Sequence, residues 1–383
     1  MGNLSTSSIH ADDFLNRVTD VAPPINVSTT FRYDNDKLIP SGEVSGSIET
    51  DKPPVYSRES HPNATRVEAV LTSVLGGPCL AYASGLSAYY AILTYLRPKK
   101  LFIAECYHGC HLAAELFSKV SGMQILSFED IDQECSAHDL VHIEDPMNPF
   151  GESCNVVKLV KKVHAKGGLV LIDSTLAPPP LRNPWEFGVD IVMHSGTKYL
   201  GGHSDLLSGV LCFKDPSWAA EIKMQRMIMG TIPASLESFL LLRSLRTLKV
   251  RVKQQSENCE ALVKHLANHA GEVSGVLAHV RHGSLQPEEY VKELNQGGYS
   301  PVFSIILKHP EQCKKLVKRV QIFQHATSLG GVESLIEWRS LSDPSIDKGL
   351  LRLSVGLEDI HDLIADLFGV LKGLQRELEE QTD

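Results

Sequence analysis

Short apolar runs alternate with amphipathic stretches through the first half of the chain. The runs are rich in Val, Ile and Leu and predict strands buried on both faces, at residues 101–104, 140–143, 169–172, 191–193 and 207–213. Residues 155–166, between two of these runs, repeat valine and leucine at helical spacing and end at a glycine pair. Strands that alternate with helices predict a mostly parallel sheet with a ligand at its carboxyl edge.

The second half of the chain has a different pattern. Residues 235–269 contain almost no helix breaker and predict one long helix that leaves the first domain. Strands are predicted at 273–282, 302–307 and 351–355, before a final helix with one apolar face. The segment before Tyr56, with a Gly/Ser-rich stretch at 41–47, predicts an extended arm. We expect an arm (1–55), an α/β domain (56–245) and a smaller C-terminal α+β domain (246–383).

Size and charge limit the possible partners. The 383 residues are 43% hydrophobic, which is enough for a large core. The net charge is −9 and no long basic run occurs, so nucleic acid and anionic membrane surfaces are disfavoured as partners. No apolar stretch approaches the length of a membrane span, and the first residues are polar. We therefore expect a cytoplasmic protein.

The eight cysteines are scattered through the chain, which predicts reduced thiols rather than a disulfide framework. One cluster stands out, because the stretch at 106–111 reads CYHGCH and offers several soft-metal ligands. A zinc site usually takes its ligands from two separated segments, and no second Cys/His pair of this spacing follows. We therefore predict no metal, although a thiol or metal sensor built on this cluster remains an alternative.

The stretch at 194–205 reads HSGTKYLGGHSD and directly follows an apolar strand. It places Lys198 at the mouth of that strand, with the hydroxyl groups of Ser195 and Thr197 beside it. A lysine next to groups that can hold a phosphate suits Schiff-base chemistry on pyridoxal 5′-phosphate (PLP). Taken alone, the run is equally compatible with a surface turn.

The whole stretch resembles the cofactor-lysine motif of the Cys/Met-metabolism (trans-sulfuration) family of PLP-dependent enzymes. Further motifs of that family occur in order from about Pro23 to Glu358. The resemblance implies the type I fold of PLP-dependent transferases, with a large, mostly parallel-sheet domain and a smaller C-terminal α+β domain. It implies β- or γ-elimination or replacement on a sulfur amino acid such as cystathionine, as in a carbon–sulfur lyase or a cystathionine γ-synthase. It also implies at least a homodimer, with a homotetramer favoured.

The resemblance implies roles for residues around the cofactor. The backbone N–H groups of Gly85 and Leu86, at a predicted helix start, would bind the phosphate together with Ser195 and Thr197. Asp173 would pair with the pyridine nitrogen. On residue type alone, Asp173 could equally cap a turn.

Two side chains would contact the cofactor from other loops. Tyr107 would stack on the cofactor ring and assist proton transfer. Asn148 would contact the cofactor's phenolic oxygen and the substrate carboxylate. Without the resemblance, Tyr107 could simply pack in the core, and Asn148 could mark a turn.

Four further residues would complete the site. Tyr56 and Arg58 match a motif that reaches the phosphate of the neighbouring subunit, and Tyr56 would also assist proton transfer. Arg352 lies in an apolar strand, where a buried charge needs an anionic partner. In the family that partner is the substrate α-carboxylate, with Ser328 nearby.

Two departures from the family pattern concern the reaction itself. Thr327 stands where many γ-acting members have glutamate and typical β-lyases have an aromatic residue. Glu337, Trp338 and Arg339 stand where a His-Pro pair is common. Besides a trans-sulfuration enzyme, the alternatives are another PLP reaction, such as transamination, and a PLP-binding protein without lyase turnover.

Overall fold

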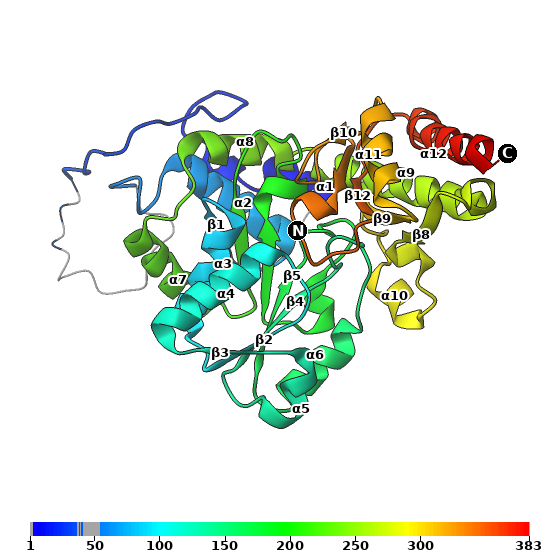
Figure 1. Cartoon of the computed structure of the whole chain (residues 1–383). Coiled ribbons are helices and arrows are strands. Elements are labelled where there is room, and N and C mark those ends of the chain that lie inside the picture. The colour runs from blue at the N-terminus through cyan, green and yellow to red at the C-terminus, as the bar shows by residue number, and fades with distance from the viewer. Residues whose placement is uncertain (1–2, 37, 39, 41–53, 383) are drawn as a thin grey trace.

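The computed structural model describes residues 3–36, 38, 40 and 54–382 (Figure 1). The Gly/Ser-rich stretch at 41–47 lies outside the described residues. The N-terminal segment is not extended throughout, because residues Leu4–His10 form helix α1. Asn3 caps this helix by accepting a hydrogen bond from the backbone N–H of Thr6. Directly after α1, Asp12 and Leu15 accept hydrogen bonds from the Arg66 guanidinium. The described residues that follow, up to 36, lie on the side opposite the C-terminal domain (Figure 1).

Among the described residues, the larger domain contains a seven-stranded sheet in the order β1-β7-β6-β5-β4-β2-β3. Neighbouring strands from β6 to β3 are parallel, whereas β7 is antiparallel to both β6 and β1. The predicted apolar runs correspond to β2, β4, β5, β6 and β7. The bounds are β1 Cys79–Tyr82, β2 Lys100–Ile103, β3 Gln124–Leu126, β4 Leu140–Glu144, β5 Leu169–Asp173, β6 Ile191–Ser195 and β7 Gly209–Phe213.

Helices cover both faces of this sheet (Figure 1). One core lies between the sheet and α2, α6 and α8, and the other between the sheet and α3, α4 and α7. Consecutive strand residues point to opposite faces, so Leu140 enters one core and Val141 the other. The bounds are α2 Pro62–Leu75, α3 Gly85–Leu96, α4 His108–Ser121, α5 Ile131–Glu134, α6 Val156–His164, α7 Pro216–Met229 and α8 Ser235–Leu245.

The chain leaves the sheet domain through two helices, not through the single helix predicted at 235–269. Helix α8 ends at Leu245, and α9 spans Leu248–Asn268. The backbone N–H of Thr247 and the guanidinium of Arg251 both donate to the carbonyl of Ser244. The Thr247 hydroxyl also donates a hydrogen bond to this carbonyl. Local side chains thus occupy an acceptor that, in a continuous helix, would bind a backbone N–H of the next turn.

In the C-terminal part, the described residues form a five-stranded sheet in the order β10-β11-β12-β9-β8. Its pairs are antiparallel except β10 with β11. Its core lies against α9, α11 and α12, and the apolar face of α12 supplies leucines to it. The bounds are β8 Leu277–Arg281, α10 Glu289–Leu294, β9 Val302–Leu307, α11 Pro310–Arg319, β10 Gln324–His325, β11 Leu335–Trp338, β12 Leu350–Ser354 and α12 Ile360–Thr382.

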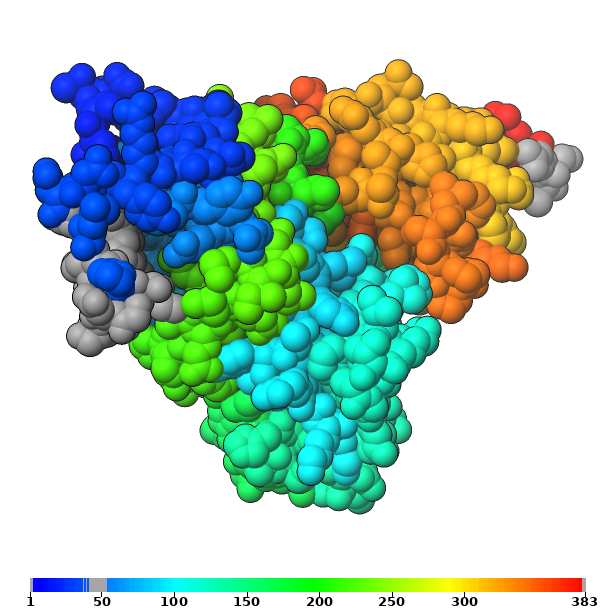
Figure 2. Space-filling view, turned by 90° about the vertical axis from the view of Figure 1, so that its left-hand side faces the viewer, coloured from blue at the N-terminus to red at the C-terminus, as the bar shows by residue number. Residues whose placement is uncertain are grey.

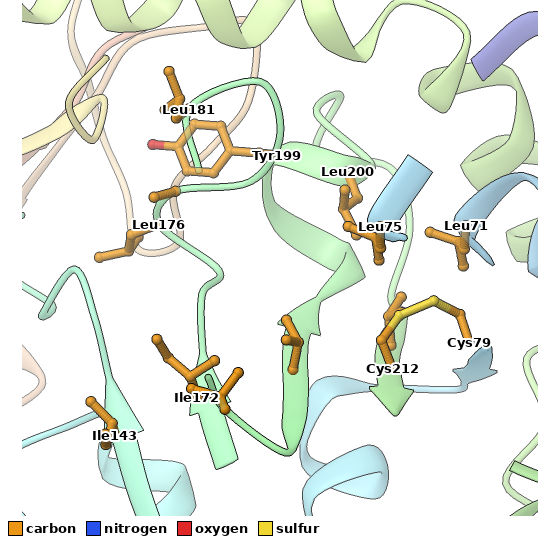
Figure 3. Close-up of a cluster of buried hydrophobic side chains, with 14 of the residues drawn as sticks. Leu71, Leu75, Cys79, Ile143, Ile172, Leu176, Leu181, Tyr199, Leu200 and Cys212 are labelled. Carbon is orange, nitrogen blue, oxygen red and sulfur yellow. A yellow bond between two sulfur atoms is a disulfide. The ribbon is translucent and has the colours of Figure 1, made fainter. Parts of the chain in front are cut away.

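The cysteine prediction is wrong for one pair, because Cys79 and Cys212 form a disulfide. They stand directly opposite each other on the antiparallel strands β1 and β7, with Cα atoms 4.3 Å apart. Figure 3 shows this bond at the edge of the core, near Leu71 and Leu75. The two residues are 133 positions apart in the chain, so only the strand pairing reveals their proximity.

No helix among the described residues has the length and apolarity needed to cross a membrane. The N-terminal residues form one outer edge of the molecule, and the C-terminal domain lies at the other (Figure 2). Several apolar side chains of this N-terminal segment are exposed, among them Val21 and Val27.

Candidate active site

A cavity of about 380 Å³ lies at the carboxyl ends of β4, β5 and β6. The start of α3 and the residues before β11 in the C-terminal domain close it from other sides. Ten of the predicted site residues line it. They are Gly85, Leu86, Tyr107, Asn148, Asp173, Ser195, Thr197, Lys198, Ser328 and Arg352.

Lys198 lies in a kinked turn, Gly196–Leu200, that follows β6 directly, and its own φ and ψ of −87° and −124° are not helical. The Lys198 ammonium donates to the Ser328 hydroxyl, with Nζ and Oγ 2.5 Å apart. Burial lowers the pKa of this amine to about 8, and the positive charge of Arg352 acts in the same direction. About one tenth of the amine is therefore uncharged at pH 7, which is far more than for an ordinary lysine.

The glycine after Leu329 brings the C-terminal domain against this lysine. Gly330 has a φ of +86°, and a Cβ there would lie 2.8 Å from the backbone nitrogen of Tyr199. Only a residue without a side chain fits this approach. Gly330 thus positions the loop that carries Ser328.

The start of α3 provides a place for an anion. Ser84 caps the helix through a hydrogen bond from the backbone N–H of Ser87, and the first helical N–H groups have no partner within the helix. Gly85 lies beside Ser195, since a Cβ on Gly85 would be 3.4 Å from the Ser195 hydroxyl. The Thr197 hydroxyl is anchored by the backbone of Ser208. Backbone N–H groups at a helix start, with hydroxyls nearby, are typical of phosphate sites.

Asp173 ends β5 and is buried. One of its carboxylate oxygens accepts hydrogen bonds from the Thr175 backbone N–H and hydroxyl, at 3.0 and 2.5 Å. Burial raises the pKa of Asp173, and the Thr175 hydrogen bonds oppose the shift. The carboxylate therefore needs a cationic partner to stay ionised in this setting.

Glu144 was not among the predicted site residues, and it ends β4 directly opposite Asp173 on β5. Its carboxylate accepts the backbone N–H groups of Tyr107 and Asn148, at 2.7 and 2.8 Å. Burial and the nearby Asp173 raise the pKa of Glu144 well above its usual value. Glu144 thus fixes the two loops that bring Tyr107 and Asn148 to the cavity. Its signal in the sequence is a charged residue at the end of a buried strand.

Arg352 lies on β12 and has a partner that we did not predict. It faces Glu337 on the adjacent strand β11, and the two side chains form a buried ion pair. The guanidinium also donates to the Asn148 side chain at 3.0 Å and to the Ser328 carbonyl at 2.6 Å. Burial lowers the pKa of Arg352 to about 10. The buried charge alone therefore does not require a substrate carboxylate, because Glu337 already compensates it.

The rim of the cavity carries Thr327 and Arg339, two of the positions at which the sequence departs from the family pattern. The Arg339 guanidinium lies 3.2 Å from the Glu337 carboxylate, so Glu337 is shared by two arginines. Tyr56 and Arg58, in contrast, do not reach this cavity within one chain. They line a separate depression, where Arg58 donates to the Met227 carbonyl at 3.1 Å.

The residues present fit PLP. The α3 start suits its phosphate, Asp173 offers a buried carboxylate to its ring nitrogen, and Lys198 offers an amine of lowered pKa to its aldehyde. A pyridinium cation next to Asp173 would also remove the cost of burying that carboxylate.

Three comparisons place the chain among known proteins. It is 31% identical over 372 residues to cystathionine γ-synthase of Escherichia coli (strain K12), and the aligned region covers 91% of this chain and 92% of that protein. It is 32% identical over 341 residues to cystathionine β-lyase of Coxiella burnetii, and this alignment covers 82% of this chain and 87% of that protein. The solved structure of apo CalE6, a methionine γ-lyase from Micromonospora echinospora, matches with a TM-score of 0.84 and 29% identity, covering 97% and 99%.

The likeness to a solved structure extends over nearly the whole chain and confirms the predicted type I fold. The model of the Cys/Met metabolism PLP-dependent enzyme family matches residues 5–372. The chain therefore belongs to the Cys/Met metabolism family and is a PLP-dependent enzyme of the carbon–sulfur lyase or γ-synthase type.

Proposed function

We propose that this enzyme catalyses β- or γ-elimination, or the matching replacement, on a sulfur amino acid such as cystathionine. The observation that carries the proposal is the position of Lys198. Its partly neutral amine lies beside Ser328 and shares one cavity with Asp173 and Arg352. A proton acceptor, an ionisable carboxylate and a carboxylate receptor are the groups that this chemistry needs.

The residues divide the work of holding the cofactor. Gly85, Leu86, Ser195 and Thr197 would bind its phosphate, and Asp173 would pair with its ring nitrogen. When bound, PLP accepts the electron pair left at Cα after the proton is removed. Thr175 would keep Asp173 oriented through the two hydrogen bonds described above.

The substrate would be held by its carboxylate. Arg352 donates to Asn148 and to the Ser328 carbonyl, so these residues form one receptor for an α-carboxylate. Lys198 would then take the Cα proton as general base. A thiol leaves directly from Cβ, or from Cγ after a second proton has moved from Cβ. Tyr107, which is half exposed in the cavity, would assist these proton transfers.

The carbon that loses the thiol depends on how the far end of the substrate is held. Thr327 lines the cavity but offers no charge to the distal ammonium of cystathionine. An exposed charge contact contributes only about 0.2–1 kcal/mol. We therefore expect weak discrimination between the two ends of cystathionine, and Thr327→Glu should favour γ-cleavage.

The test is to supply cystathionine and quantify both keto acids. Cleavage at Cβ gives pyruvate, ammonia and homocysteine, and cleavage at Cγ gives 2-oxobutyrate, ammonia and cysteine. We expect both keto acids from the wild type, a shift toward 2-oxobutyrate in Thr327→Glu, no shift in the uncharged control Thr327→Gln, and no product from Lys198→Ala.

Two results would contradict parts of this proposal. Keto-acid formation without release of a thiol would replace elimination by transamination. Formation of 2-oxobutyrate alone, with a ratio unchanged in Thr327→Glu, would move the specificity to another part of the rim, with Arg339 the next residue to test.

A further inference from the structure

Three buried side chains converge behind the cofactor cavity. They are Cys110 in the first turn of α4, His142 on β4 and Asp173 at the end of β5. The Cys110 sulfur, a His142 ring nitrogen and an Asp173 carboxylate oxygen all lie within 4.8 Å of one another. This is the one group of three or more such ligands that the described part of the chain brings together.

His142 is a buried polar residue whose ring is unsatisfied. The residue is 1% exposed, and neither ring nitrogen has a hydrogen-bond partner among the described residues. An unpaired polar group in the interior costs free energy, and buried polar groups normally have partners. The ring packs against Tyr89 with centroids 4.9 Å apart, so it is held in place without being satisfied.

A second thiol lies four residues before Cys110 in the chain. Cys106 is partly exposed, and it packs against the same buried apolar cluster that contains Cys110. Asp173 lines the cavity, so a solute that enters the cavity reaches the cluster at that carboxylate.

We propose that Cys106, Cys110, His142 and Asp173 form a binding site for a zinc-type divalent cation. Two thiolates, one imidazole and one carboxylate are ligands that Zn²⁺ prefers in tetrahedral sites. Each thiol loses its proton to solvent when the metal binds. Metal–ligand bonds of about 2.0–2.3 Å put neighbouring ligand atoms about 3.5 Å apart. The side chains of Cys110, His142 and Asp173 must therefore close by roughly 1 Å, and the Cys106 thiol must turn toward them.

Ligands of a metal need not come in pairs at short spacing in the chain, which was the pattern sought in the sequence. In the fold, the second pair comes from β4 and β5, which are adjacent parallel strands with His142 and Asp173 near their carboxyl ends. Their proximity depends on the sheet and leaves no local trace in the sequence.

The site would compete with the cofactor for Asp173. This coupling rests on the proposed role of Asp173 at the ring nitrogen, whereas the metal site itself does not. One carboxylate oxygen of Asp173 already accepts hydrogen bonds from Thr175. A divalent cation and a pyridinium would both need the other oxygen, and their positive charges would repel each other there. Metal should therefore weaken PLP binding, and PLP should weaken metal binding by the same factor.

The experiment titrates the purified enzyme with Co²⁺ under a phosphine reductant, with and without PLP, and then displaces Co²⁺ with Zn²⁺. We expect one equivalent of Co²⁺ with sulfur-to-metal charge-transfer absorption. Cys106→Ser, Cys110→Ser and His142→Phe should each weaken binding at least about 10-fold. Two matched controls should bind as the wild type does. Cys135→Ser removes another buried cysteine, and His194→Phe removes another buried histidine whose ring nitrogens lack partners.

The outcomes test the metal site and its coupling to PLP separately. Absence of Co²⁺ binding by the reduced, PLP-free wild type, or binding that His142→Phe and Cys110→Ser leave unchanged, overturns the metal site. Binding that is unaffected by PLP overturns the shared use of Asp173 and counts against its proposed role at the ring nitrogen. Circular dichroism of each variant shows whether a loss of binding reflects unfolding. Cys106→Ser, at a partly exposed loop position, tests the site without altering the core.

Discussion

Lys198 and Asp173 are residues whose chemistry depends on burial. Loss of hydration disfavours the charged form of each, so the pKa of the lysine falls and that of the carboxyl rises. Neither shift can be deduced from residue type. Both favour the proposed function, since the lysine becomes a base at neutral pH and the carboxyl favours a cationic partner.

A pH prediction follows for Lys198. Only the uncharged amine can attack the PLP aldehyde, and its pKa of about 8 sets its population. The rate of PLP capture by the cofactor-free enzyme should therefore rise about tenfold per pH unit below pH 8 and level off above it. With an ordinary lysine, the capture rate would continue to rise up to about pH 10.5. The measurement is the visible absorbance of bound PLP after rapid mixing.

The control for this experiment is Nα-acetyl-lysine mixed with PLP under the same conditions, which removes the titration of PLP itself. If the capture rate of the enzyme has the same pH dependence as that of Nα-acetyl-lysine up to pH 10, the amine of Lys198 is solvated as in water.

At the scale of elements, the site is built where strands end and loops begin. Glu144 and Asp173 end adjacent strands, and Lys198 follows the next one. The loop around Ser328 comes from the C-terminal domain, and Gly330 allows its close contact with the lysine turn. A side chain at this glycine would act on the site through the position of the loop.

Gly330→Ala should move this loop away from Lys198. The substitution adds a methyl group at a positive φ and within 2.8 Å of the Tyr199 backbone. We expect KM for the amino-acid substrate to rise at least about tenfold, because Ser328 and its contact with Arg352 shift together. Gly271→Ala is the matched control, since a Cβ there meets no atom within 4 Å. The measurement is steady-state kinetics of both variants. An unchanged KM in Gly330→Ala would contradict the role of Gly330 in positioning the loop.

At the scale of the whole molecule, one chain does not supply the complete set of predicted site residues. Both domains contribute to the cavity, through Lys198 and Asp173 on one side and Ser328 and Arg352 on the other. Tyr56 and Arg58 lie elsewhere, next to an N-terminal segment with exposed apolar side chains. Their predicted contact with a phosphate therefore requires a neighbouring subunit.

Subunit mixing tests this arrangement. Arg58→Ala should weaken PLP binding at least about 30-fold, as expected for loss of a charge-assisted pair. Lys198→Ala should be inactive. In mixed dimers of the two variants, one site combines the intact Lys198 of one subunit with the intact Arg58 of the other, so activity should return.

Activity is measured after the two variants are unfolded and refolded together, with each variant refolded alone as the control. If verified mixed dimers remain inactive, Arg58 belongs to its own subunit's site or to none.

The sequence by itself determined five of the seven strands of the large domain, the position of the lysine turn and, through the family resemblance, the cofactor. These features follow from local patterns, because apolar runs, helix starts and the 194–205 stretch are contiguous in the chain. Only the tertiary structure decided which distant residues meet. The Cys79–Cys212 bond, the Arg352–Glu337 pair, the anchoring role of Glu144 and the cluster around His142 each join positions on neighbouring strands or separate elements. Strand pairing and burial create these contacts, and neither is encoded at any single position.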